Sequence, residues 1–335
     1  MFWKNLKVAW RDLRRHKGNA VITIAGLAVG AACCFLIVLY VGHELNYDNY
    51  HNDEDRVFRL LLQTDFMGWK TLAMCSELAA PTLREDYPEV EFAARVHQGR
   101  SLALRSEKAA AYEDGFFYAD QDIFEILTIP FLQGRPGGAL ERPGTVVLTE
   151  SVAAKYFGDQ DPMGQSLFIN NALYEVTGVL RDSPTNTHVK YRALISFKSI
   201  ESERDKMHWT RYDFLTYLKV RSRTDMEAFS AKVAHLSDPY LPKKSLSDRG
   251  QEFLLQPIGA VHLDRNVNWD VEAHGNKDTL LLLAALGLLI LFIACLNFIN
   301  QTTARAGGPK RSASEKPSGL NLPNWSGSFW GNPFS

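Results

Sequence analysis

Two long uncharged apolar runs constrain this chain more than any other feature. The first covers Ala20–Gly42, which is 23 residues, and the second covers Leu280–Ile299, which is 20 residues. Neither run contains Asp, Glu, Lys or Arg. Because an α-helix rises about 1.5 Å per residue, roughly 20 apolar residues cross the ~30 Å hydrocarbon core of a bilayer. Both runs are therefore predicted to be transmembrane helices.

The first run could instead be a cleaved signal peptide, because basic residues precede it. The apolar part of a cleaved signal is only about 7–15 residues long and ends at a small-residue cleavage site. This run is longer, and no such site follows in the stretch "LYVGHE". An uncleaved membrane anchor is the favoured interpretation.

The distribution of basic residues predicts the orientation. Residues Met1–Lys17 carry six Lys or Arg and the single acid Asp12. Three further basic residues follow the second run: Arg305, Lys310 and Arg311. Since basic flanks stay on the cytoplasmic side, both chain ends are predicted to be cytoplasmic. Residues 43–278 are then extracytoplasmic, in a multi-pass protein of a bacterial inner membrane.

The first 16 residues have the pattern of a basic amphipathic helix that lies on the inner leaflet. Apolar residues recur at helical spacing and basic residues take the other side. The candidate interfacial anchors are Trp3, Trp10, Arg11, Arg14 and Arg15. The alternative is that this stretch is only the positive flank of the first membrane helix.

Four small or polar residues in the apolar runs are candidates for helix packing. Gly26 and Gly30 are four residues apart, a spacing that lets another helix approach closely, although Gly is common in membrane helices. Asn297 and Asn300 lie near the inner end of the second run. Their amides either form hydrogen bonds to a neighbouring helix or reach the membrane interface.

The region between the runs mixes helix and strand patterns. A strand is predicted at Thr145–Leu148 and a helix at Glu150–Phe157, with Thr149 as N-cap and Gly158 as C-cap. Asn170-Asn171 separates two β-rich runs and predicts a hairpin. Further predicted elements are a helix with Pro81 in its first turn that stops before Pro88, a strand at Phe214–Val220, a helix capped by Thr224 or Asp225, and a strand starting at Glu252.

The fold class that follows is a membrane protein with two transmembrane α-helices that flank a large α+β extracytoplasmic domain in two subdomains. The predicted segments are a cytoplasmic amphipathic helix (1–17), a first membrane helix (18–42), the α+β domain (43–278), a second membrane helix (279–301) and a cytoplasmic tail (302–335).

No motif for catalysis, cofactors or metals is found. The chain contains no phosphate-binding P-loop, no G-x-S-x-G and no H-E-x-x-H. His43 and His51 could form a metal pair, but the stretch "HELNYDNYHNDED" is better interpreted as a solvated polar collar outside the membrane. "RDSPTNTH" (Arg181–His188) is interpreted as a turn. We therefore expect no catalytic, cofactor or metal residues, and a protein that is not an enzyme.

Charge and cysteine content exclude two further classes. The formal net charge of −1 argues against a nucleic-acid partner, which favours a basic face. Of the four cysteines, only Cys75 lies outside the apolar runs, so no disulfide is expected in the region between them.

Several stretches together resemble the ABC-transporter permeases of the MacB/FtsX type. The stretches are "NLKVAWRDLRRHKGNAVITIAGLAVG", "ELNYDNYHNDEDRVFRL", "VVLTESVAAKYFGDQDPMGQSL", "YEVTGVLRDSPTNTHVKY" and "LFIACLNFINQTTARA". The layout agrees as well, since such permeases carry a large extracytoplasmic domain between their first two membrane helices. The resemblance covers about Met1–Ala306.

The resemblance implies partners and a mechanism. A separate cytoplasmic ABC ATPase would bind the inner face, membrane lipid would surround the helices, and two permeases would form a homo- or heterodimer. Movement driven by ATP would then pass to the outer domain for export or for handling of lipoproteins or peptides. The alternative is a membrane-anchored extracytoplasmic binding or sensory module without transport. The sequence does not identify a substrate.

The stretch after Ala306 departs from this resemblance. Such a permease continues with a basic helix and further membrane helices, whereas here a Gly-, Pro- and Ser-rich tail follows. Reading the tail codons in a shifted frame forces Leu, Leu and Gly where a family-like "LVRQFLGES" needs them, and permits "RAKEVGIRKAIG" from Gly307. We therefore expect an out-of-frame tail, with a natural disordered tail as the alternative. The DNA sequence across codons 300–335 distinguishes them.

Overall fold

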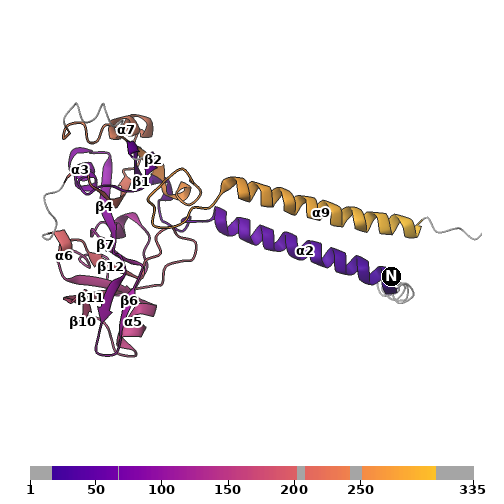
Figure 1. The fold of residues 1–335 in the computed structure, drawn as a ribbon, viewed down its shortest axis with the longest axis horizontal. Coiled ribbons are helices and arrows are strands. Elements are labelled where there is room, and N and C mark those ends of the chain that lie inside the picture. The colour runs from indigo at the N-terminus through magenta and orange to yellow at the C-terminus, as the bar shows by residue number, and fades with distance from the viewer. Residues whose placement is uncertain (1–16, 67, 202–207, 242–250, 307–335) are drawn as a thin grey trace, which may run out of the picture. The chain divides into compact units, whose positions relative to one another are not determined.

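The computed structural model describes residues 17–66, 68–201, 208–241 and 251–306 (Figure 1). The predicted basic helix, with Trp3, Trp10, Arg11, Arg14 and Arg15, lies outside these residues. The predicted out-of-frame tail, residues 307–335, also lies outside them. Contacts divide the chain into two compact units, and the folded domain belongs to the unit Cys33–Leu288.

Two long apolar helices flank the domain, as predicted. Helix α2 covers Lys17–Leu45 and α9 covers Lys277–Ala306. Both contain a stretch that is long and apolar enough to cross a membrane, Ile24–Leu45 and Lys277–Asn300. Only 6% and 11% of the most apolar windows are buried, which distinguishes these helices from the core helix of a soluble protein. Their exposed apolar side chains are suited to contact with lipid.

The domain between these helices is built on one mixed sheet. The strands are β1 (Val57–Phe66), β2 (Trp69–Leu72), β3 (Cys75–Ser76), β4 (Val90–Gln98), β5 (Leu102–Arg105), β6 (Ala110–Glu113), β7 (Phe116–Ala119), β8 (Phe131–Gln133), β9 (Thr145–Thr149), β10 (Ser166–Ile169), β11 (Ala172–Leu180), β12 (Ala193–Ser196), β13 (Tyr212–Val220) and β14 (Glu252–Pro257). Their order is β14-β1-β13-β4-β7-β12-β9-β11-β10-β5-β6, with β2, β3 and β8 paired at the sides. The pairs β7–β12 and β9–β11 are parallel, and the other pairs are antiparallel.

Short helices cover this sheet. They are α3 (Ala79–Asp86), α4 (Ile123–Ile126), α5 (Glu150–Phe157), α6 (Lys198–Glu201) and α7 (Met226–Val233), together with the 3-10 turns η1 (Glu54–Arg56) and η2 (Ile258–Ala260). Figure 1 shows α3 and α7 at one end of the domain and α5 at the other. One continuous sheet runs through the domain, so the division into two subdomains stays a prediction.

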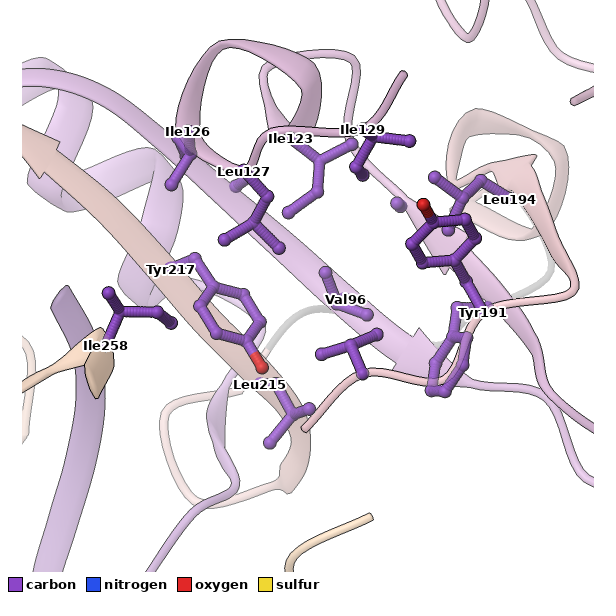
Figure 2. Close-up of a cluster of buried hydrophobic side chains, with 14 of the residues drawn as sticks. Val96, Ile123, Ile126, Leu127, Ile129, Tyr191, Leu194, Leu215, Tyr217 and Ile258 are labelled. Atoms are coloured by element: carbon purple, nitrogen blue, oxygen red, sulfur yellow. The ribbon is translucent and has the colours of Figure 1, made fainter. Parts of the chain in front are cut away.

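Three hydrophobic clusters fill the domain. One cluster joins β1, β4 and β13 to α3 and α7, and a second joins β7, β9 and β12 to α5. The third, which we call the central cluster, contains Val96, Leu127, Leu215, Tyr217 and Ile258 among others (Figure 2). The central cluster also includes Val261 and Val267, from the linker between β14 and α9. Burial of the linker's apolar side chains therefore holds the start of α9 to the domain.

Local sequence signals predicted several elements correctly. Helix α5 covers the predicted Glu150–Phe157, and Gly158 ends it at φ 64° with its N–H bonded to the Ala154 carbonyl. Asn170 and Asn171 have φ 48° and 66°, as a two-residue hairpin between β10 and β11 requires. Helix α3 has Pro81 in its first turn, and Phe214–Val220 lies within β13. Thr149 precedes α5 without a capping hydrogen bond from its side chain, and it is Asp225 that caps α7.

Gly178 in β11 offers a test of the packing between the sheet and the β8 segment. A Cβ atom on Gly178 would lie 2.7 Å from Phe131 Cε1 and 3.0 Å from Val147 Cγ1. We expect Gly178→Ala to lower the free energy of unfolding by about 1–3 kcal/mol, because the ring and the strand must move apart. Gly137→Ala is the matched control, since nothing lies within 4 Å of its Cβ position. Chemical denaturation of the detergent-solubilised chain measures the free energy of unfolding of both variants. An equal loss of stability in the two variants would contradict the close packing at Gly178.

Candidate functional site

The segment that follows α2 folds back on the loop before β12. The backbone N–H of Asp48 donates to the carbonyl of Asn186 at 3.0 Å. The Asn186 side-chain amide donates to the carbonyl of Asn46 at 2.8 Å, and the Tyr47 hydroxyl donates to the carbonyl of Thr185 at 3.3 Å. The C-terminal end of α2 is therefore clamped to this loop by three hydrogen bonds between segments about 140 residues apart.

The carboxylate of Asp48 is at the centre of this clamp and is fully buried. Its Oδ1 accepts hydrogen bonds from Thr187 Oγ1 at 2.9 Å and from the His188 backbone N–H at 3.2 Å. Its Oδ2 lies 2.9 Å from Nδ1 of His188. Asp48 has φ 59°, a left-handed conformation that Asp tolerates better than most residues. A carboxylate without solvent is stable only when it is compensated in this way.

These contacts set the protonation state of Asp48. Burial by itself would raise the pKa of the carboxyl group. The charge of the neighbouring His188, together with the close approach of the His188 and His51 rings and the Thr187 hydroxyl, outweighs burial and holds the pKa well below its usual range. Asp48 is therefore ionised at any physiological pH.

His51 lies on the other side of Asp48 and extends the clamp to the end of α4. Its Nδ1 accepts a hydrogen bond from the Thr128 backbone N–H at 3.1 Å, so the proton of the neutral ring belongs on Nε2. That Nε2 faces Asp48 Oδ1 at 3.7 Å. The backbone N–H of Asn52 donates in turn to Thr128 Oγ1 at 2.7 Å. His51 is only 5% exposed, so the interpretation of this stretch as a solvated collar is wrong for His51.

A second buried network holds the linker before α9. Arg59, the third residue of β1, is fully buried, and its Nη1 lies 2.5 Å from Oδ2 of Asp270. Its Nε and Nη2 both donate to Oε1 of Gln256, at 3.1 and 2.8 Å. The Gln256 amide then donates to Asp264 at 3.0 Å, and His274 Nε2 lies 3.3 Å from Asp270. An ion pair within the domain therefore fixes the linker.

Tyr217 on β13 joins the two networks. Its hydroxyl lies 2.8 Å from Nε2 of His188. In the β1–β13 ladder Tyr217 is directly opposite Arg59, whose positive charge acts on the phenol. Burial raises the pKa of Tyr217, so the phenol stays protonated. A continuous polar path thus runs from Asp48 through His188, Tyr217 and Arg59 to Asp270.

The end of α2 also touches the β14–α9 linker directly. Glu44 Oε2 lies 2.9 Å from His262 Nε2, and the Tyr47 ring stacks on the His262 ring at a centroid distance of 3.4 Å. Gly275 donates its N–H to the His262 carbonyl, and a Cβ there would lie 2.7 Å from His262 Nε2. Any larger residue at position 275 would therefore have to displace the His262 and Glu44 side chains. Glu44 is mostly buried, so the solvated-collar interpretation is wrong for Glu44 as well.

We call these contacts together the junction, namely Glu44, Asp48, His51, Arg59, His188, Tyr217, His262 and Asp270. Within the described ranges no group of three or more His, Cys, Asp or Glu side chains is arranged to hold a metal ion. The junction is instead an arrangement of ion pairs and hydrogen bonds. Such an arrangement can transmit force between the helix ends and the sheet, because its buried members have no alternative partner in water.

The predicted helix-packing residues lie where α2 and α9 run side by side (Figure 1). A Cβ on Gly30 would lie 3.3 Å from the Ala294 Cβ, and one on Gly26 would lie 3.7 Å from Asn297 Nδ2. The Asn300 carbonyl accepts a hydrogen bond from Thr303 Oγ1 of the same helix. Their packing role stays a prediction, which these distances support for Gly26, Gly30 and Asn297.

The sequence patterns did not predict the junction. The stretch "RDSPTNTH" was interpreted as a turn and His188 as one of several scattered histidines, whereas the structure places His188 against Asp48. The family resemblance was the one sequence signal that pointed to these segments. Both segments of the clamp belong to the stretches that carry the family resemblance, "ELNYDNYHNDEDRVFRL" and "YEVTGVLRDSPTNTHVKY".

Comparison with protein families decides the classification. The family model of the MacB-like periplasmic core domain matches residues 20–236. The chain belongs to this family. The match includes α2 and most of the domain, with Asp48, Arg59, His188 and Tyr217 of the junction. The protein is thus a membrane-embedded member of the ABC-transporter permease family, and that family is typically not enzymatic.

Several solved structures are similar to part of this chain. A domain of a putative permease from Porphyromonas gingivalis matches with a TM-score of 0.53 and 19% identity, covering 61% of this chain and 90% of that one. The periplasmic region of MacB from Actinobacillus actinomycetemcomitans matches with a TM-score of 0.45 and 14% identity, covering 62% and 90%. The extracellular domain of the noncanonic ABC-type transporter YknZ from Gram-positive bacteria matches with 0.43 and 13%, covering 60% and 99%. A search of curated proteins finds no match.

Replacing the central carboxylate tests the junction. We expect Asp48→Asn to lower the free energy of unfolding at pH 7 by about 2–4 kcal/mol, because it removes one partner of a buried pair. The folded-state pKa of Asp48 is lowered, so its contribution is complete above the ordinary value of 3.8 and is lost as the pH falls below it. The difference in the free energy of unfolding between wild type and variant should therefore become smaller at acidic pH.

The control for this change is Asp53→Asn. Asp53 shares the left-handed backbone of Asp48, with φ 58°, but its carboxylate is exposed. Denaturant titrations of the two variants and the wild type at neutral and acidic pH provide the measurement. An Asp48→Asn variant no less stable than Asp53→Asn would contradict the role of the buried carboxylate.

Proposed function

We propose that the chain is a permease subunit of an ABC-type transporter and passes movement of its membrane helices to its α+β domain. A separate cytoplasmic ABC ATPase hydrolyses ATP, and the domain lies outside the membrane with the N-terminus in the cytoplasm. The permease acts as a homo- or heterodimer surrounded by membrane lipid. The task is export or the handling of lipoproteins or peptides.

The observation that carries this proposal is the continuous junction. A domain that is only tethered to the membrane needs no buried ion pair where it joins either helix, because a flexible linker is sufficient. Here the clamp at Asp48 holds α2, and the Arg59–Asp270 pair holds the linker to α9. Glu44 and His262 connect the two anchors. Stiff connections at both helices are what coupling between distant sites requires.

The runner-up function is a membrane-anchored binding or sensory module without transport. It shares the anchors and the domain, and it differs in having no ATPase partner. Affinity purification of the chain, co-expressed with an ABC ATPase encoded beside its gene, separates the two. The proposal expects a stable complex with at least one of two forms. These are the 335-residue chain and a form whose reading frame is restored after Ala306. Absence of a complex in both forms would support the module.

Removal of the Tyr217 hydroxyl group tests whether the junction couples the helices to the domain. In the complex, we expect Tyr217→Phe to leave the ATPase rate within about two-fold of wild type. It should reduce the ATP-dependent change in distance between spin labels at Arg100→Cys of two protomers by at least about half, because the His188–Arg59 connection is lost. Electron paramagnetic resonance measures this distance after the four native cysteines are replaced.

Tyr191→Phe is the matched control for this experiment. Tyr191 lies in the same central cluster, and its hydroxyl forms no hydrogen bond to any described residue (Figure 2). The control should retain the full distance change. If Tyr217→Phe also retains it, the junction does not carry the movement.

A further inference from the structure

The histidines of the junction do not all respond to acid in the same way, because their ring nitrogens face different partners. In three cases a ring nitrogen lies close to a carboxylate oxygen, at 2.9, 2.9 and 3.3 Å in the pairs His188–Asp48, His262–Glu44 and His274–Asp270. A protonated ring can donate to a carboxylate. Each of these three contacts is therefore compatible with a charged histidine.

His51 is the exception, because one of its ring nitrogens faces a donor. Its Nδ1 accepts the Thr128 N–H at 3.1 Å, and its Nε2 faces Asp48 at 3.7 Å. The neutral ring carries its one proton on Nε2, so a second proton must bind to Nδ1. There it would meet the N–H of Thr128, and two donors cannot form a hydrogen bond with each other. The contact between His51 and Thr128 can therefore exist only while the ring is neutral.

The surroundings of His51 are mostly apolar and uncharged. The ring lines a small cavity whose apolar members are Val96, Ile123, Leu127, Ile129, Val189 and Leu194. Tyr50 and Tyr191 also line it, and burial raises the pKa of both phenols, so both stay uncharged. Among the described residues that line this cavity or form an ion pair with His51, only Asp48 is charged. Asp48 attracts a charged ring at Nε2, on the side away from the Thr128 contact.

The contact with Thr128 joins the clamp to the segment between α4 and β8. Thr128 is the second residue after α4, and β8 begins at Phe131. The Thr128 hydroxyl also accepts a hydrogen bond from the N–H of Asn52, which does not titrate. Protonation of His51 therefore weakens the hold on this segment by one hydrogen bond, while the contacts that Asp48 makes with Thr187 and His188 are unaffected.

We propose that His51 is an acid-sensitive latch of the junction. When the pH around the domain falls through the range in which histidine ordinarily takes up a proton, near about 6.5, the charged ring stays beside Asp48 and releases Thr128. The α4–β8 segment is then coupled less firmly to α2, whereas the linker before α9 stays held. The regulatory meaning rests on the proposed placement of the domain outside the membrane. The latch itself does not depend on an ATPase, so it is tested without that partner.

Amide hydrogen exchange of the full chain in nanodiscs, resolved to single residues by mass spectrometry, tests this latch. Exchange is compared at about pH 7.5 and about pH 5.5, each relative to the intrinsic rate at that pH. We expect the protection of the Thr128 N–H to fall roughly three- to ten-fold at the lower pH, the factor that one hydrogen bond of ordinary net strength provides. The N–H groups of His188 and Gly275 should keep their protection, because Asp48 and the His262 carbonyl still accept them.

The variant His51→Asn removes the titrating ring and keeps an acceptor, because an Asn Oδ1 can take the position of Nδ1. We expect its Thr128 protection to be equal at the two pH values. His235→Asn is the matched control, since His235 is exposed and lies outside the junction, and it should respond to pH as the wild type does.

Three results would overturn the latch. They are unchanged Thr128 protection in the wild type at the lower pH, an equal loss at His188 and Gly275 that indicates general acid unfolding, and an acid-induced loss in His51→Asn as large as in the wild type. The first two are measured on the wild type, so they decide the matter even if a variant does not fold. Failure to bind an ATPase would contradict the proposed function and would leave all three readouts as they are.

Discussion

The carboxylate of Asp48 is charged, has no contact with solvent and lies three residues after the C-terminal end of α2. A buried charge of this kind forces its surroundings into one arrangement, because losing a partner costs several kcal/mol. It requires the Thr187 hydroxyl, the His188 N–H and the His188 ring where they are. The direction in which the chain leaves α2 and the course of the loop before β12 are therefore set together.

The same constraint extends across the domain to the second helix. His188 contacts Tyr217, Tyr217 faces Arg59, and Arg59 holds Asp270 in the linker to α9. The apolar side chains of the central cluster surround this path and exclude water, which strengthens each polar contact. Under the proposed function, a domain joined in this way passes on the movement of its helices that a separate ATPase drives.

The elements that sequence patterns predicted are those specified by neighbouring residues. The length of the two apolar runs, the helix between Thr149 and Gly158, and the Asn170-Asn171 turn all depend on positions close together in the chain. The junction was not predictable in this way, because Asp48 and His188 are 140 residues apart and each lies in a polar stretch typical of a loop. Charged residues are usually solvated, so the interpretation of a polar collar was the natural one. Only the fold brings the compensating groups together.

The central claim is that the junction is rigid, and amide hydrogen exchange tests it most directly. In nanodiscs, the N–H groups of Asp48, His188, Asn268 and Gly275 are expected to exchange as slowly as those in the middle of β1. Those of Asp48, His188 and Gly275 are bonded within the clamp or the linker, and that of Asn268 joins the linker to Thr71 of β2. All four lie outside regular helices and strands. Exchange of these amides at the rate of an exposed loop would show that the helices are flexibly tethered, and would contradict the account.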